Sequence, residues 1–288
     1  MAGFEDKYWW SQDGLRLHYR DYAGREDRPP ILCLPGLTRN VRDFEPVADR
    51  LAGEWRLIVV ELRGRGESAY AKDPMSYDPL VYLQDINRLI DELGVPRLVG
   101  FGTSLGGILL MLLAAARRDC LAGVLLNDIG PELDPAGLER IARSVGTGSA
   151  QPTWVHAARA VEDVQKVVYP HYRLEDWLRL AKRFYRLTSQ GRIVLDYDAR
   201  IAEPFRAAGG AINVDLWPAF MALEGLPVAV VRGELSDLLS TGTAQAMIAR
   251  MPGLDLVTVP DVGHTPTLEE PEAIAAIDGL LARVLARP

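Results

Sequence analysis

The sequence has 288 residues, of which 48% are hydrophobic and 25% are charged, and its formal net charge is −7. This length suffices for one large α/β domain that carries an inserted segment. The negative charge and the lack of a long basic run exclude nucleic acid as the main partner, because phosphate binding needs a basic face.

The two cysteines and the N-terminal residues indicate the compartment. Cys33 and Cys120 are not clustered, so we expect reduced thiols and neither a disulfide framework nor a metal site. The polar, acidic N-terminal residues do not resemble a signal peptide, and no apolar run reaches membrane-spanning length. We therefore expect a cytoplasmic protein with no cofactor, no metal and no membrane partner.

Strand-like and helix-like segments alternate through the first 130 residues. Alternating apolar and polar residues predict a β-hairpin at 7–11 and 15–22. Further strands are expected at 30–34, 55–62, 96–101 and 121–127, and helices at 41–51, 80–93 and 105–117. This order predicts a mostly parallel sheet with helices on both faces and the antiparallel hairpin at one edge.

The alternation stops from residue 131 to about residue 223. This stretch has helical runs rich in aromatic residues, no clear strand and a loop at Gly209-Gly210. The alternation resumes with strands at 226–232 and 254–259 and helices at 241–251 and 272–286. We therefore expect a core domain of residues 1–130 and 224–288, with eight strands, and a helical cap of residues 131–223.

The most informative stretch is a G-x-S-x-G pattern at residues 102–106, between a predicted strand and a predicted helix. A serine on such a sharp turn is held in a strained conformation, and its hydroxyl is exposed at the helix N-terminus. The pattern alone is common in proteins, but in this context it identifies Ser104 as a candidate nucleophile.

A serine hydroxyl becomes a good nucleophile when an imidazole takes its proton and a carboxylate orients that imidazole. Of the four histidines, His264 follows the last predicted strand, at the sheet edge that also holds Ser104. Asp237 follows the strand after the insertion and gives the chain order Ser–Asp–His. Asp128 and Glu234 are alternatives; we favour Asp237, and Asp128 would otherwise anchor the start of the insertion.

Acyl transfer also needs two donors for the negatively charged oxygen that develops in the transition state. The backbone amide of Leu105, at the start of the helix, is one candidate. The amide of Leu37 is the other, because Gly36 lets that loop approach closely.

Together these motifs resemble those of the α/β-hydrolase fold superfamily. The matching segments are Leu34-Pro35-Gly36-Leu37, residues 61–68, residues 102–107, residues 232–237 and residues 262–271. The resemblance implies a serine carboxylesterase or lactonase with a helical cap that shapes the substrate pocket. It also implies a triad of Ser104, Asp237 and His264, with Leu37 and Leu105 as oxyanion-hole donors.

The sequence departs from its relatives at two positions. Pro35 stands where members often carry histidine, which weakens the match to the carbon–carbon bond hydrolases. Glu61 stands where members often carry aspartate. Serine at the elbow argues against haloalkane dehalogenases and epoxide hydrolases, which use an aspartate there.

The leading hypothesis is hydrolysis of a small-to-medium carboxylic ester or lactone through an acyl-enzyme on Ser104. A carbon–carbon bond hydrolase of a diketone-type substrate, using the same residues, is the alternative enzyme. A non-catalytic ligand receptor on the same fold is the alternative from a different class. We expect a small ester-like partner and a monomer or homodimer.

Overall fold

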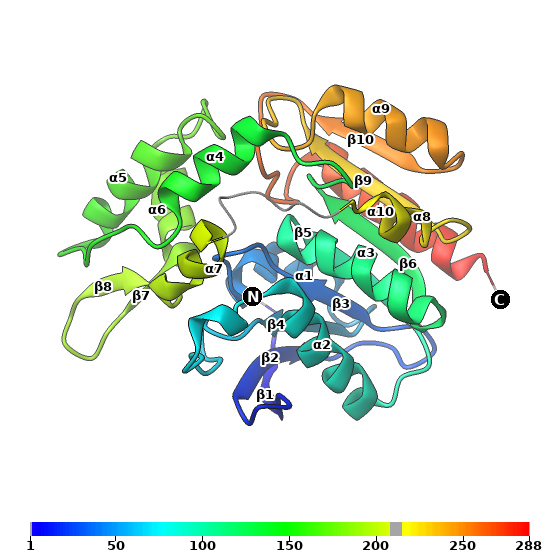
Figure 1. Cartoon of the computed structure of the whole chain (residues 1–288), viewed down its shortest axis with the longest axis horizontal. Helices are drawn as coiled ribbons and strands as arrows, with labels where there is room; N and C mark the ends of the chain where they lie inside the picture. Colours follow the sequence, from blue (N-terminus) through cyan, green and yellow to red (C-terminus); the bar gives the residue numbers. More distant parts are fainter. Residues whose placement is uncertain (1, 208–214, 288) are drawn as a thin grey trace.

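The computed structural model describes residues 2–207 and 215–287. An eight-stranded sheet in the order β1-β2-β4-β3-β5-β6-β9-β10 runs through its centre (Figure 1). β1 pairs with β2 and β2 with β4 in antiparallel fashion, and all other neighbours are parallel. The predicted parallel sheet with a hairpin at one edge is therefore confirmed. The strands are β1 (Glu5–Trp10), β2 (Arg16–Tyr22), β3 (Ile31–Leu34), β4 (Leu57–Glu61), β5 (Leu98–Thr103), β6 (Leu121–Asn127), β9 (Val228–Gly233) and β10 (Asp255–Val259).

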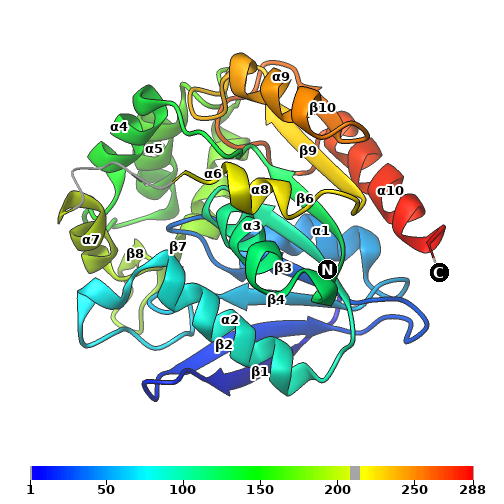
Figure 2. The same cartoon turned by 45° about the vertical axis from the view of Figure 1, so that its right-hand side comes forward.

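Helices cover both faces of this sheet, which is why the central strands are buried along their whole length. α1 and α10 pack on one face, and α2, α3 and α8 pack on the other (Figure 2). The helices of the core are α1 (Glu45–Leu51), α2 (Pro79–Leu93), α3 (Leu105–Arg117), α8 (Trp217–Met221), α9 (Thr241–Arg250) and α10 (Pro271–Leu285), with short 3-10 turns at Val41–Phe44, Pro74–Ser76 and Arg118–Cys120.

The segment between β6 and β9 forms a group of helices beside the sheet (Figure 1). The helices at Trp154–Gln165 and Leu174–Phe184 pack together around Trp177, which is almost fully buried in an apolar cluster separate from those of the core. The segment also contains an antiparallel pair of short strands, so the expectation of an insertion without strands was wrong. Its elements are α4 (Pro135–Ser144), α5 (Trp154–Gln165), α6 (Leu174–Phe184), β7 (Tyr185–Leu187), β8 (Ile193–Leu195), a 3-10 turn at Ala199–Ile201 and α7 (Ala202–Ala207).

α8 differs from the rest of the range that we predicted as a cap. It packs against α3, and Phe220 and Leu223 are fully buried in the main apolar core. The loop expected at Gly209-Gly210 lies outside the described residues.

The inserted segment contacts the loops that follow the strands of the core. The amide of Gly66, after β4, donates to the carbonyl of Asp196 over 3.0 Å. The amide of Gly263, after β10, donates to the carbonyl of Val168 over 2.8 Å. Because these loops follow the strands, the insertion lies over the carboxyl ends of the sheet, where α/β proteins bind their ligands.

None of the helices within residues 2–207 and 215–287 combines the length and apolarity that a bilayer crossing needs.

Candidate active site

Ser104 occupies the turn between β5 and α3, as the sequence predicts. Its φ of 51° and ψ of −115° are strained for a residue with a side chain. The crossing of strand and helix requires glycine on both sides: a Cβ on Gly102 would lie 2.5 Å from the backbone of Gly106, and one on Gly106 would collide with the carbonyl of Leu34. The tight turn leaves the Ser104 side chain half-buried at the start of α3.

His264 lies beside Ser104, also as predicted. Its Nε2 is 2.9 Å from the Ser104 Oγ, which is hydrogen-bonding distance. The imidazole is buried in the loop after β10. Its other nitrogen, Nδ1, lies 2.7 Å from Oδ2 of Asp128. Ser104, His264 and Asp128 therefore form a hydrogen-bonded triad. This is the arrangement that activates a serine nucleophile.

Asp128 is the carboxylate of this triad, whereas the chain order of the motifs favoured Asp237. Asp128 directly follows β6, is completely buried, and has a left-handed φ of 54°. Its Oδ1 accepts from the amide of Gly233 over 2.8 Å, and its Oδ2 accepts from the Ser236 hydroxyl over 2.6 Å. These donors compensate the cost of burying the carboxylate and aim it at His264.

Asp237 lies in the loop after β9, but its side chain has a different partner. Its neighbour Ser236 points toward Asp128, while the Asp237 carboxylate accepts from Nε and Nη2 of Arg140 over 2.5 and 2.8 Å. The prediction that Asp237 orients His264 is corrected on this geometry, because Asp128 already fills the position below the imidazole. Glu234 is exposed and accepts from the amide of Asp261.

Asp237 is nevertheless close enough to His264 for the two side chains to interact electrostatically. Burial alone would raise the pKa of the Asp237 carboxyl, but the Arg140 guanidinium, with a smaller contribution from His264, holds the pKa below its ordinary value. Asp237 is therefore a carboxylate anion paired with the Arg140 cation near His264.

The loop after β3 approaches Ser104 closely. A Cβ on Gly36 would lie only 3.8 Å from the Ser104 Cβ, so the Gly36–Leu37 peptide borders Ser104. Leu105 is the first residue of α3, where backbone amides have no partner within the helix. The structure thus brings both predicted amide-bearing residues, Leu37 and Leu105, next to Ser104.

Arg65, for which no role was predicted from the sequence, fixes the position of Leu37. Its fully buried guanidinium donates from Nε and Nη2 to the carbonyl of Leu37, over 2.8 and 2.5 Å. It also donates from Nη1 to the carbonyl of Arg63 and to the Tyr82 hydroxyl. Because these acceptors are uncharged, the arrangement places a positive charge directly behind the loop that borders Ser104.

A cavity of about 120 Å³ opens above Ser104 and His264. Core residues form one side, and residues of α4, α5 and α6 close the other. Its wall combines apolar side chains with the guanidinium groups of Arg39 and Arg140. The lining residues are Gly36, Leu37, Thr38, Arg39, Asp43, Thr103, Ser104, Arg140, Ile141, Ser144, Val145, Gln165, Tyr169, Phe184, His264 and Thr265.

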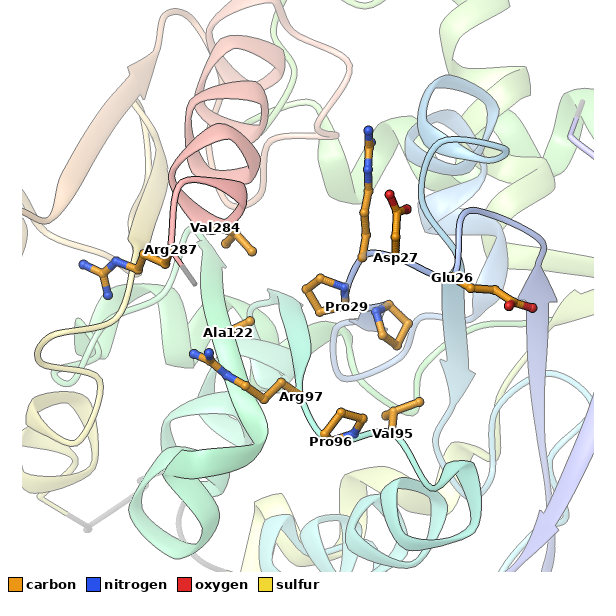
Figure 3. A pocket seen from close by; sticks show the side chains of 11 residues that line it. Glu26, Asp27, Pro29, Val95, Pro96, Arg97, Ala122, Val284 and Arg287 are labelled. Atoms are coloured by element: carbon orange, nitrogen blue, oxygen red, sulfur yellow. The ribbon is translucent and has the colours of Figure 1, made fainter.

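A larger cavity, of about 370 Å³, lies at the opposite end of the strands (Figure 3). It is bordered by Pro30, just before β3, by Arg97, just before β5, and by Arg287, just after α10. Since it lies at the amino ends of the strands, it is separate from Ser104 and His264.

The fold and this site define a hydrolase of the α/β class. Residues 31–277 match the alpha/beta hydrolase family, and the chain belongs to that family. It is 36% identical over 271 residues to the 3-hydroxybutyrate-oligomer hydrolase of Cupriavidus necator, and the aligned region covers 90% of each chain. It is 29% identical over 244 residues to the 2-(acetamidomethylene)succinate hydrolase of Mesorhizobium japonicum, and the aligned region covers 85% of this chain and 84% of the relative.

Among solved structures, the chain is similar to the crystal structure of an alpha/beta hydrolase from Novosphingobium aromaticivorans. The two share 57% sequence identity and superpose with a TM-score of 0.94, over 98% of this chain and 99% of the other. The family and these relatives support a general hydrolase role.

Proposed function

We propose that this protein is a serine hydrolase that cleaves a short carboxylic ester. The observation that carries the proposal is the line from Ser104 Oγ through His264 to Asp128, with distances of 2.9 and 2.7 Å. Ser104 is the nucleophile, His264 is the general base, and Asp128 holds the imidazole in the required tautomer.

In the first half of the reaction, the Ser104 Oγ attacks the ester carbonyl carbon while His264 Nε2 takes the hydroxyl proton. The carbonyl oxygen becomes an oxyanion, and the amides of Leu37 and Leu105 donate to it. When the tetrahedral intermediate collapses, the bond to the alcohol oxygen breaks and His264 returns the proton to that oxygen. The alcohol leaves, and an acyl-enzyme on Ser104 remains.

In the second half, water takes the place of the alcohol. His264 removes a proton from the water as its oxygen attacks the acyl carbon. Collapse of this second intermediate breaks the bond to Ser104 Oγ, which takes the proton back from His264. The carboxylic acid is released and the site returns to its starting state.

The cavity and the relatives together support short esters of hydroxy acids as substrates. A volume of about 120 Å³ suits a short acyl group better than a long lipid chain. The relative from Cupriavidus necator is named for the hydrolysis of 3-hydroxybutyrate oligomers. We propose a related substrate here, and we propose that residues 131–207 act as the cap that encloses it.

Labelling with a fluorophosphonate tests the nucleophile. The wild-type protein should be labelled and should hydrolyse p-nitrophenyl butyrate, and Ser104→Ala should lose both properties while keeping the wild-type melting temperature. A wild-type protein that neither labels nor hydrolyses the ester would favour a ligand receptor. Faster cleavage of a ring-cleavage diketone than of the ester would favour the carbon–carbon bond hydrolase.

A further inference from the structure

We propose that Arg140 binds a free carboxylate of the substrate, so that the enzyme prefers esters that carry a negative charge on the leaving hydroxy acid. This inference rests on the proposed ester hydrolysis. It concerns the carboxylate of the leaving group, which the triad of Ser104, His264 and Asp128 does not contact. A linear dimer of 3-hydroxybutyrate is the simplest molecule of this class.

Arg140 belongs to the inserted segment but lines the same cavity as Ser104 and His264. Its side chain is 22% exposed, and that of its partner Asp237 is 32% exposed. Asp237 takes the edge of the guanidinium formed by Nε and Nη2. Within the described residues, Nη1 has no hydrogen-bond acceptor, so one edge of the fork is available to a ligand.

The backbone around Arg140 fixes this position. One turn earlier, α4 packs so closely on the loop after β9 that a Cβ on Gly137 would lie 2.6 Å from the Asp237 carbonyl. Just before the helix, the amide of Asp134 donates to the carbonyl of Leu238 over 2.9 Å. The guanidinium is therefore held in place by the helix and by Asp237, so little side-chain freedom is lost when an anion binds.

Arg39 is the other arginine of the cavity, and its surroundings differ. It pairs with Asp43 in the same manner, over 2.5 and 2.6 Å, but the Phe184 ring covers its face at 3.3 Å. It lies two residues after Leu37, in the loop that borders Ser104. Arg140 lines the cavity from α4, and in the described part of the chain its Nη1 edge has no acceptor, so it is the better placed of the two for the carboxylate.

The test compares two dimers of 3-hydroxybutyrate, one with the free terminal carboxylate and one with a terminal carboxamide. The two have the same shape and a single ester bond, but only the first carries the charge. For Arg140→Gln we expect kcat/KM to fall by roughly 10- to 100-fold with the acid, as for the loss of one charge-assisted hydrogen bond, and by less than about threefold with the amide.

Two further variants sharpen the comparison. Arg143→Gln removes the same charge from the same helix, but Arg143 is exposed, pairs with Glu139 and does not line the cavity. It should leave kcat/KM with both dimers unchanged. Asp237→Asn frees the guanidinium of its competing anion, and it should raise kcat/KM with the acid relative to the amide.

Equal losses with both dimers in Arg140→Gln would show that Arg140 only fastens the cap, and would overturn the proposal. The same would follow if Arg39→Gln, and not Arg140→Gln, gave the loss specific to the acid. If wild type cleaves neither dimer nor p-nitrophenyl butyrate, the proposed ester hydrolysis fails separately. Calorimetric binding of 3-hydroxybutyrate and of its amide to Ser104→Ala then decides the subsite, which requires acid binding at least about tenfold weaker when Arg140→Gln is added.

Discussion

The carboxylate of Asp128 lies 2.7 Å from Nδ1 of His264, although the two residues are 136 positions apart in the chain. Asp128 follows β6 directly, and His264 follows β10. The carboxylate therefore follows a strand next to the one that precedes Ser104, and Asp237 pairs with Arg140 of the inserted segment.

Exchanging each aspartate for asparagine separates these two roles. Asp128→Asn should lower kcat for p-nitrophenyl butyrate by about 10³- to 10⁴-fold, because the imidazole loses the anion that holds its tautomer. Asp237→Asn should lower it by less than about tenfold. Steady-state kinetics of both variants measure the difference, and melting temperatures within a few degrees of wild type serve as the folding control. A larger loss of kcat in Asp237→Asn than in Asp128→Asn would show that Asp237 is the catalytic carboxylate.

The alternation of strands and helices, and the sheet edge that holds Ser104 and His264, could be predicted from the sequence because both follow from regular patterns. Each predicted strand of the core overlaps an observed one, and the loops after parallel strands meet at the same edge of the sheet. That rule brings Ser104 and His264 together without any knowledge of side-chain directions. β7 and β8 were missed because strands of three residues leave no recognisable alternation.

The choice between Asp128 and Asp237 could not be made in this way. Both residues follow strands at the same edge, so chain order and topology allow either one. The directions of the two side chains decide which carboxylate reaches His264. Asp128 has a left-handed φ, and the Ser236 hydroxyl, next to Asp237 in the chain, donates to Asp128. The contact between Arg65 and Leu37 was equally invisible, since it joins residues 28 positions apart through a side-chain conformation.

Arg65 should act on the oxyanion hole as a positioning residue. In Arg65→Gln the carbonyl of Leu37 loses both guanidinium donors, and we expect kcat for p-nitrophenyl butyrate to fall by about 10- to 100-fold while KM changes little. Tyr82→Phe is the control, because it removes an acceptor of Arg65 without touching Leu37. Equal changes in kcat and KM, or an equal effect of Tyr82→Phe, would contradict this role.

His18 should make the stability of the fold depend on pH. Its ring nitrogens lie 2.8 Å from Glu61 and 2.9 Å from Asp6. Burial alone would lower the pKa of His18, but the hydrogen bonds and charges of Glu61 and Asp6 raise it above the ordinary value of 6.5. Because the folded state binds the proton more tightly, the stabilisation is complete below pH 6.5 and is lost as the pH rises through the raised pKa.

Thermal unfolding of wild type and His18→Gln between pH 5.5 and pH 9 would measure this contribution, with the range chosen to bracket roughly the titration of a histidine. The difference in melting temperature should be largest at the acidic end and should shrink toward pH 9. His171→Gln, which removes an imidazole whose side chain is 75% exposed, provides the matched substitution for comparison. A difference that grows with pH would contradict the assignment.

Gly106→Ala should destabilise the elbow, whereas Gly279→Ala should stabilise α10. A methyl group on Gly106 would collide with the carbonyl and side chain of Leu34 in β3, where backbone must move, and the free energy of unfolding should fall by about 3 kcal/mol or more. Gly279 lies inside α10 with no atom near its Cβ position, so alanine should raise that free energy by about 0.5–1 kcal/mol through helix propensity. Urea unfolding of both variants gives the two values. A loss below about 1 kcal/mol in Gly106→Ala would mean that strand and helix can separate at the nucleophile without cost.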